Sequence, residues 1–292
     1  MRTRDSVLEY QRVLSDAGTL TVDLDLVDPV SALYLEFQAT NGATSNKDNF
    51  LSDVITKIEI VDGSTVLYSV NLSQLEALAF YKTGRVPVLL PSSFASGSQR
   101  HGVHLLFGRH LWDRDYCMDF TRFKNPQLKI TSNLAAIRAV GATGYVTATL
   151  KATVVAKVME DSGTVPNQYL MAKELEAFTS VTSGDKRIQL PTDYVYRMLM
   201  GRFWVQLSDI DEVITNVKLT MDTDKYIAFD RKTKQLDAEA LARWGPGRLK
   251  HDIFTQHQAA FRLLFNKEPF YTPLGWEAAT PTIIGARYFW SS

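Results

Sequence analysis

The sequence predicts an all-β chain that contains two tandem copies of one β-barrel. Residues 53–60 read DVITKIEI and residues 212–219 read EVITNVKL, so nearly the same strand appears twice, 159 positions apart. Each half consists of short runs in which apolar and polar residues alternate, separated by turn residues. This pattern is typical of β-sandwiches and β-barrels. The few helical stretches occupy matching places in the two halves, and do not alternate with every strand as in an α/β protein.

The first half begins with a predicted helix and continues as strands. Residues 5–15 place Val7, Tyr10 and Leu14 at helical spacing. Asp62-Gly63 predicts a hairpin turn. Residues 72–82 predict an amphipathic helix with Ser73 as its N-cap. Runs with strand character follow one another at 19–26, 32–39, 54–61, 64–71, 103–108, 126–133 and 144–159.

The second half repeats this order after a linker. Residues 160–168 are charged and contain Gly and Pro without periodicity, so we expect one domain over 1–160 and a second over 161–292. The second domain would open with a linker helix at 169–178 and carry a later helix at 234–244. Its expected strands lie at 183–190, 201–207, 212–219, 225–230 and 261–266.

Offsets between matching residues drift as an old duplication predicts. The offset is 166 from Leu24 to Leu190 and 163 from Gly84 to Gly247. It is 159 for the repeated strand, and the decrease falls in the region that contains the polar loop 40–49. Only the short segment 266–292 follows Phe265, so the last strands of the second barrel should be shorter or differently routed.

Composition and charge narrow the function classes. Lys+Arg and Asp+Glu both number 32, and this balance argues against a free-standing nucleic-acid binder. A net charge of zero protects poorly against self-association, which suits a shell-forming subunit. The single cysteine, Cys117, excludes an intrachain disulfide. No apolar run approaches the ~20 residues of a membrane span, so we expect a soluble protein made in the cytoplasm.

Several blocks resemble a known family. They are GDKRIQLP (184–191), ITNVKLTMDTDKYIAFDRKTKQLDAEALARW (214–244), and in the first half ITKIEIVDG (55–63) with VLYSVNLSQLEALAFYKTGR (66–85). Their order is similar to that in the double jelly-roll major capsid proteins of tailless icosahedral, membrane-containing phages. Within this group the blocks most resemble the corticovirus-type coat, which belongs to the adenovirus/tectivirus structural lineage. The resemblance covers most of 8–110 and 170–265 by pattern.

The resemblance implies a fold and an assembly. Each half would be an eight-stranded jelly roll with a short inserted helix. Three copies of the chain would form a pseudo-hexameric capsomer, because a closed three-fold of two-barrel chains supplies six barrels. Such capsomers would tile a virion shell over an internal membrane, beside penton and minor capsid proteins. In this family the N-terminal helix lies near the membrane, so Met1, Arg2 and Arg4 would face anionic lipid headgroups.

No catalytic, cofactor-binding or metal site is expected, and so no enzyme. The common hydrolase, nucleotide-binding and zinc motifs are absent. His101 and His104 suggest a polar strand edge. The densest cluster of metal-ligand residue types in the sequence contains His110, Asp113, Asp115 and Asp119. These side chains could hold a metal ion, but their spacing is not that of an EF-hand. Structural Ca²⁺ is known in this kind of capsid, and no spacing here demonstrates it. Cys117 is most simply a small buried apolar residue.

Two rival functions stay open. Tandem β-sandwiches could instead recognise carbohydrate or a receptor, as a virion spike or a lectin. A β-sandwich hydrolase would use paired carboxylates, for which the candidates are Asp23 with Asp25 and Asp222 with Asp224. The first pair alternates with apolar residues and should face solvent on a strand, and the second should lie in a turn.

Overall fold

The structure is a computed structural model that carries side chains. It describes residues 2–43, 51–84, 88–90, 95–134, 144–160, 168–178, 184–201, 214–222, 224–244, 249–254, 270–271 and 283–288 of the 292-residue chain. Met1 lies outside the described residues. None of the helices in these ranges is long and apolar enough to cross a membrane.

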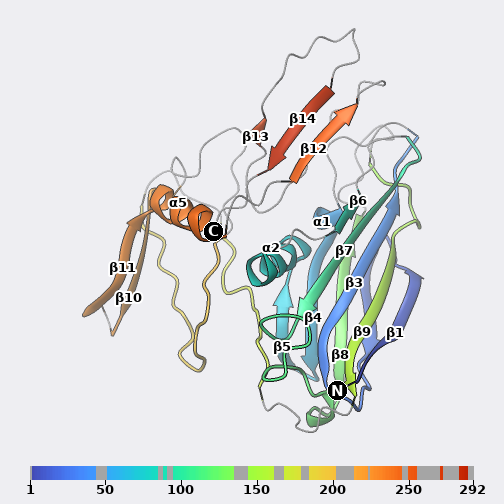
Figure 1. Cartoon of the computed structure of the whole chain (residues 1–292), viewed down its shortest axis with the longest axis horizontal. Helices are drawn as coiled ribbons and strands as arrows, with labels where there is room; N and C mark the ends of the chain where they lie inside the picture. Colours follow the sequence, from blue (N-terminus) through green and yellow to red (C-terminus); the bar gives the residue numbers. More distant parts are fainter. Residues whose placement is uncertain are drawn as a thin grey trace.

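The first half of the chain, from β1 to β9, forms a complete jelly roll (Figure 1). Its strands are β1 (Arg2–Val13), β2 (Ala17–Asp23), β3 (Val30–Thr40), β4 (Ile55–Asp62), β5 (Thr65–Val70), β6 (Val88–Leu90), β7 (Ser98–Leu106), β8 (Pro126–Asn133) and β9 (Lys151–Glu160). The helices are α1 (Leu51–Val54), α2 (Leu72–Thr83) and the short 3₁₀ turn Phe120–Arg122.

Strand order identifies the fold. One sheet runs β1-β9-β3-β7-β6 and the other β2-β8-β4-β5, and every neighbouring pair within both is antiparallel. Apart from the β4–β5 hairpin and from β6, which adds an edge strand, successive strands alternate between the sheets, and β8 and β9 return beside β2 and β1. This is the order of eight strands in two Greek keys. The predicted all-β jelly-roll class is therefore confirmed for this half.

The core fills the space between the two sheets. Alternate residues of β3 and β9 point inward, and those of β4 and β8 meet them from the other sheet. Phe37, Tyr68, Phe107 and Phe120 are among the largest fully buried side chains. Buried and half-buried residues alternate strictly along β8, which is the pattern expected of a strand with one face in a core.

Helix α2 closes the barrel beside β7 and β4. Its Leu72, Leu75 and Leu78 stripe is buried as predicted, and Gly84 ends it in a left-handed C-cap with φ 67°. The predicted N-cap Ser73 is wrong, because Ser73 is buried within the first turn. Asn71 caps the helix: its side chain accepts from the Gln74 N–H at 2.8 Å, and the Gln74 side chain accepts from the Asn71 N–H at 2.9 Å.

The described part of the second half repeats the hairpin and helix. β10 (Asn216–Met221) pairs with β11 (Tyr226–Lys232), and helix α5 (Thr233–Trp244) follows at once, as α2 follows β4 and β5. Further along, β12 (Leu249–Phe254), β14 (Ile283–Tyr288) and β13 (Phe270–Tyr271) form a small sheet. The complete second barrel stays a prediction.

A β-bulge marks the same point in both hairpins. The register shifts between Ile60 and Val61 in the first hairpin and between Leu219 and Thr220 in the second. The separation of Ile60 from Leu219 equals the offset of the repeated strand. In both hairpins the extra residue is on the returning strand. Because bulges are specific local features, their agreement strengthens the case for duplication beyond sequence likeness.

The predicted N-terminal helix is wrong, because Arg2–Val13 is strand β1. Two bulges explain why Val7 and Tyr10 lie on one face, whereas Leu14, the third residue of the predicted stripe, is buried beyond the end of β1. The register of β1 on β9 shifts between Val7 and Glu9 and again between Glu9 and Arg12. Each bulge adds one residue to the usual period of two, so apolar residues three apart fall on one face of a strand and imitate a helix.

Other predicted elements also differ. Residues 169–178 are extended and do not form the predicted linker helix, since backbone groups of Leu170, Ala172 and Glu174 bond to the first barrel. Residues 184–190, predicted as part of a strand, have no ladder partner among the described residues. The last strand of the first half begins at Lys151, later than expected. The predicted strands at 201–207 and 261–266 lie outside the described residues, apart from Gly201.

Candidate functional site

The loop between β7 and β8 is organised by one arginine and one buried carboxylate. Arg109 donates to Asp113 through Nε at 2.7 Å and Nη2 at 2.8 Å, and reaches Asp115 at 2.5 Å. Asp113, with a side chain 1% exposed, also accepts the backbone N–H groups of Arg109 and Asp115. The hydrogen bond from Arg109 is the main reason that the pKa of Asp113 lies well below its usual range.

The side chains of the predicted ligand group have partners within the loop. Asp113 already accepts four hydrogen bonds, and Asp119 accepts from Thr121 N and Oγ1 as the cap of the 3₁₀ turn. His110 Nδ1 lies 3.1 Å from the Leu111 carbonyl. Within the described ranges, no three His, Cys, Asp or Glu side chains are grouped so that they could hold a metal ion. The residues therefore serve loop structure, and sequence reasoning missed the role of Arg109.

Replacing Asp113 should destabilise the loop far more than replacing its exposed neighbour. Asp113→Ala removes the acceptor of four hydrogen bonds and should lower the free energy of unfolding by about 2–3 kcal/mol. Asp115→Ala, whose side chain is 70% exposed, should change it by less than about 1 kcal/mol. Urea unfolding of both variants measures the difference. Equal losses would contradict the role given to Asp113.

The strap, residues 168–174, joins the linker to this loop and to the edge of β5. Cys117 N donates to the Gln168 carbonyl, and Leu170 N donates to the Phe107 carbonyl. Further on, Ser69 N donates to Ala172 O and Glu174 N to Ser69 O, each at 2.9 Å. The strap thus pairs locally in parallel with β5 and covers that edge of the four-stranded sheet, which would otherwise expose a row of unpaired backbone groups.

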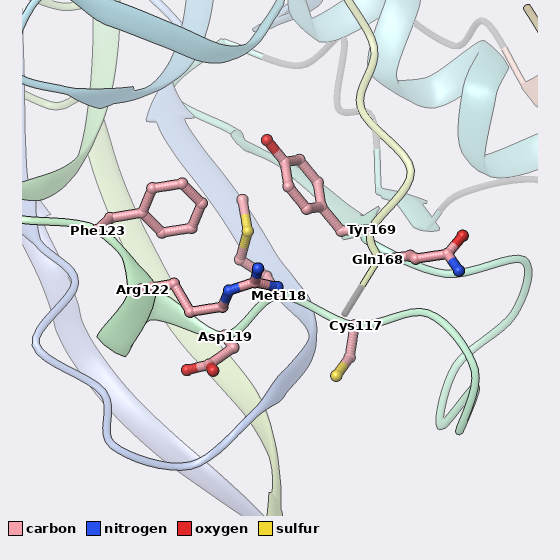
Figure 2. Close-up of a pocket in the computed structure, with 7 residues that line it drawn as sticks. All are labelled: Cys117, Met118, Asp119, Arg122, Phe123, Gln168 and Tyr169. Carbon is pink, nitrogen blue, oxygen red and sulfur yellow. The ribbon is translucent and has the colours of Figure 1, made fainter. Parts of the chain in front are cut away.

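A pocket of about 280 Å³ lies where the strap meets the loop (Figure 2). Its lining residues are Cys117, Met118, Asp119, Arg122, Phe123, Gln168 and Tyr169. The rings of Phe123 and Tyr169 meet edge-on at 6.4 Å, and the side chains of Cys117 and Asp119 point away from Tyr169 (Figure 2). Burial raises the pKa of the Cys117 thiol to about 12, so it is not a nucleophile at neutral pH. The pocket lies between two packed segments of the chain, the strap and the loop.

The two histidines of HGVH face opposite sides of β7, which lies between two strands, so the predicted polar edge is wrong. His101 points toward α2, where its Nε2 lies 3.1 Å from Glu76 Oε1. Both side chains are buried. Burial lowers the pKa of His101 to about 3, so the imidazole is neutral at neutral pH. An ionised Glu76 would raise the pKa of His101. Desolvation has the larger effect and lowers this pKa, because the ring is removed from water.

A second ionisable side chain anchors the same helix. Lys82 Nζ donates to the Leu106 carbonyl at the end of β7, at 2.9 Å. Burial, followed by the charge of Arg197, lowers the pKa of Lys82 to about 8. Lys82 therefore adds a hydrogen bond between α2 and β7 to the packing of the buried leucines of the helix. A polar residue on a buried helix stripe was visible in the sequence, but its partner on β7 was not.

The carboxylate pairs considered for hydrolysis lie where the sequence placed them. Asp23, the last residue of β2, and Asp25, just after it, are both exposed. The Asp23 carboxylate accepts a hydrogen bond from Gln127 Nε2 at 2.8 Å. Asp222 and Asp224 flank the turn of the β10–β11 hairpin, both with positive φ. Their nearest cations are Lys225 at 3.6 Å and Arg187 at 3.7 Å, respectively. Neither pair lines the pocket, which is the kind of position that hydrolysis would need.

The predicted membrane-facing residues lie at one end of the barrel. Arg2 is exposed at the start of β1, whereas Arg4 is paired with Asp28 at 3.2 Å and Glu160 at 2.5 Å. The turn between β4 and β5 and the loop 107–125 lie at this same end, beside the N-terminus (Figure 1). Arg2 is therefore the more available of the two cations.

Comparisons with known proteins give partial structural likenesses. No family model matches the sequence, and no curated protein matches it. The STIV MCP has a TM-score of 0.41 at 15% identity, over 55% of this chain and 49% of that one. A quasi-atomic structure of the PBCV-1 virus capsid has a TM-score of 0.41 at 11% identity, over 56% and 43%. The chain spans about half the length of these structures.

Proposed function

We propose that this chain is a major capsid protein, a structural subunit without catalytic activity. Three copies would form a pseudo-hexameric capsomer, and capsomers would tile the icosahedral shell of a bacteriophage over an internal membrane. Its partners would be further copies of itself, penton and minor capsid proteins and membrane lipids, with no direct contact to nucleic acid. The protein would be made in the host cytoplasm and reside in the virion capsid.

The observation that carries this proposal is a jelly roll whose distinctive hairpin and helix recur. Jelly rolls serve in viral capsids and in lectins, so the fold alone does not choose between them. The bulge that recurs at the offset of the repeated strand supports two equivalent barrels in one chain. Two barrels per chain suit a closed three-fold ring, since three copies then present six barrels of similar shape.

Electron microscopy of the purified protein tests this assembly. We expect class averages of single particles with six lobes around a three-fold axis, and hexagonal arrays at high concentration. A glycan array serves as the matched test of the lectin alternative, and we expect no binding. Single-lobed or two-lobed particles that bind a glycan would overturn the capsid proposal and favour the recognition module.

The N-terminal end of the barrel would face the membrane. Arg2 is the exposed cation there, and each cation near an anionic surface contributes about 1 kcal/mol. Arg2→Ala should therefore weaken flotation with phosphatidylserine vesicles roughly fivefold, and Arg4→Ala should have a smaller effect because Arg4 already pairs with Asp28 and Glu160. Lys151→Ala serves as the control, because Lys151 begins β9 at the opposite end of the barrel from Arg2. Binding that is unaffected by Arg2→Ala would remove the membrane role of this end.

A further inference from the structure

Strand β1 exposes three large apolar side chains. Val7, Tyr10 and Val13 are 58%, 73% and 51% exposed. Among the described residues up to Glu160, the other exposed large apolar side chains are Val27 and Val146, and both stand singly in loops. Single exposed apolar residues are ordinary, whereas a contiguous group indicates an interaction surface.

The two bulges of β1 place all three side chains on one face of the sheet. Val7 lies opposite Val155 and Val13 opposite Lys151, and both of these partners on β9 are half-buried. Glu9 and Arg12 lie opposite the buried Val154 and Ala152, so Tyr10 falls at the level of Thr153. Without the bulges, alternation would send Tyr10 to the opposite face from Val7. We call Val7, Tyr10, Val13 and Val155 the outer β1 patch.

A polar rim of paired charges borders the outer β1 patch. Lys157 Nζ lies 2.7 Å from Asp5 and 5.9 Å from the centre of the Tyr34 ring. Farther across the sheet, Arg100 lies 3.5 Å from Glu36. An apolar centre with a polar rim is the usual anatomy of a protein interface. Both of these cations are paired with an anion, so the rim suits a protein surface of mixed charge better than a polyanion or an anionic membrane.

The position of the outer β1 patch leaves it open to another molecule. β1 is the edge strand of its sheet and lies on the side of the barrel away from α2, β10, β11 and α5 (Figure 1). Strand pairing at that edge is disfavoured, because bulges and charged side chains such as Glu9 and Arg12 protect it. The contact would therefore be made by side chains across the sheet face.

We propose that the outer β1 patch binds the same patch on a second copy of this chain, across a two-fold axis between capsomers. The proposal rests on the capsid function proposed above and names one of its lateral contacts. A patch of uncharged apolar side chains is complementary to itself, and two-fold contacts are the commonest in protein assemblies. The chain's net charge of zero leaves little repulsion between copies.

Disulfide trapping in the full-length protein tests the contact. The sole native cysteine, Cys117, is buried, so Tyr10→Cys introduces one accessible thiol. We expect Tyr10→Cys to give covalent dimers at least about tenfold faster than Val27→Cys, whose position is 82% exposed and outside the patch. Equal rates for the two variants would overturn the proposal.

A double variant that introduces two negative charges provides the second measurement. Val7→Glu combined with Tyr10→Glu should weaken association between capsomers by about 10–100-fold, since carboxylates would face one another across the two-fold axis. It should leave the three-copy mass and the melting temperature near those of Val27→Glu. Unchanged association would show that the outer β1 patch does not form the contact between capsomers, and it would not affect the proposed capsid function. A wild-type chain that stays monomeric would instead overturn the capsid function, and this inference with it.

Discussion

Lowering the pH from 6.5 toward 3 is expected to destabilise the first barrel, and His101→Gln should remove much of that loss. The folded-state pKa of His101 is about 3 against an ordinary 6.5. In this window the unfolded chain binds a proton that the folded chain does not. Stability is therefore full above pH 6.5 and falls as the pH drops, by at most roughly 1.4 kcal/mol per pH unit.

Urea unfolding at several pH values between 6.5 and about 4 measures this slope. The upper part of the window is preferable because Asp113, whose pKa lies below 3.8, adds its own loss at lower pH. His110→Gln is the matched control, because it replaces a histidine that is exposed on a loop, away from α2. A His101→Gln variant that follows the wild-type pH dependence would show that the buried pair under α2 does not govern acid stability.

Releasing the strap should separate the two halves of the chain. Leu170→Pro removes the N–H that donates to Phe107 O, and Glu174→Pro removes the N–H that donates to Ser69 O. Each lost bond should cost about 1–3 kcal/mol, and the double variant should also expose the β5 edge. Limited proteolysis is expected to cleave the double variant near residues 161–178 much faster than the wild type.

Glu176→Pro is the matched control for the strap. It lies beyond Glu174, which makes the last backbone bond of the strap to Ser69, and it is exposed. It should leave the proteolysis rate close to that of the wild type. If the double variant resists protease as well as the control does, the strap does not fasten the linker to the first barrel.

Most strands of the first barrel could be predicted because each has one face in the core. β8 alternates strictly and β3 alternates from Leu33 onward, and the predicted bounds of β3, β4, β5 and β8 lie close to the observed ones. β1 could not be predicted in this way. It is an edge strand with little burial and two bulges, so its apolar residues follow a period of three and its partner β9 lies far along the chain.

The strap was mispredicted for a related reason. Residues 169–178 have helical spacing, but their backbone groups bond to Phe107 and Ser69, and tertiary contact overrides local propensity. The Arg109–Asp113 pair could have been suspected from opposite charges close together in a loop. The contact between Glu76 and His101 could not, because it depends on where α2 lies on β7.

The mass of the purified protein in solution tests the central claim most directly. Light scattering after size exclusion should give one sharp species near three times 32.9 kDa, the mass of one capsomer. A chain that remains near 32.9 kDa at high concentration would contradict the capsid account and bring the carbohydrate- or receptor-binding module to the front.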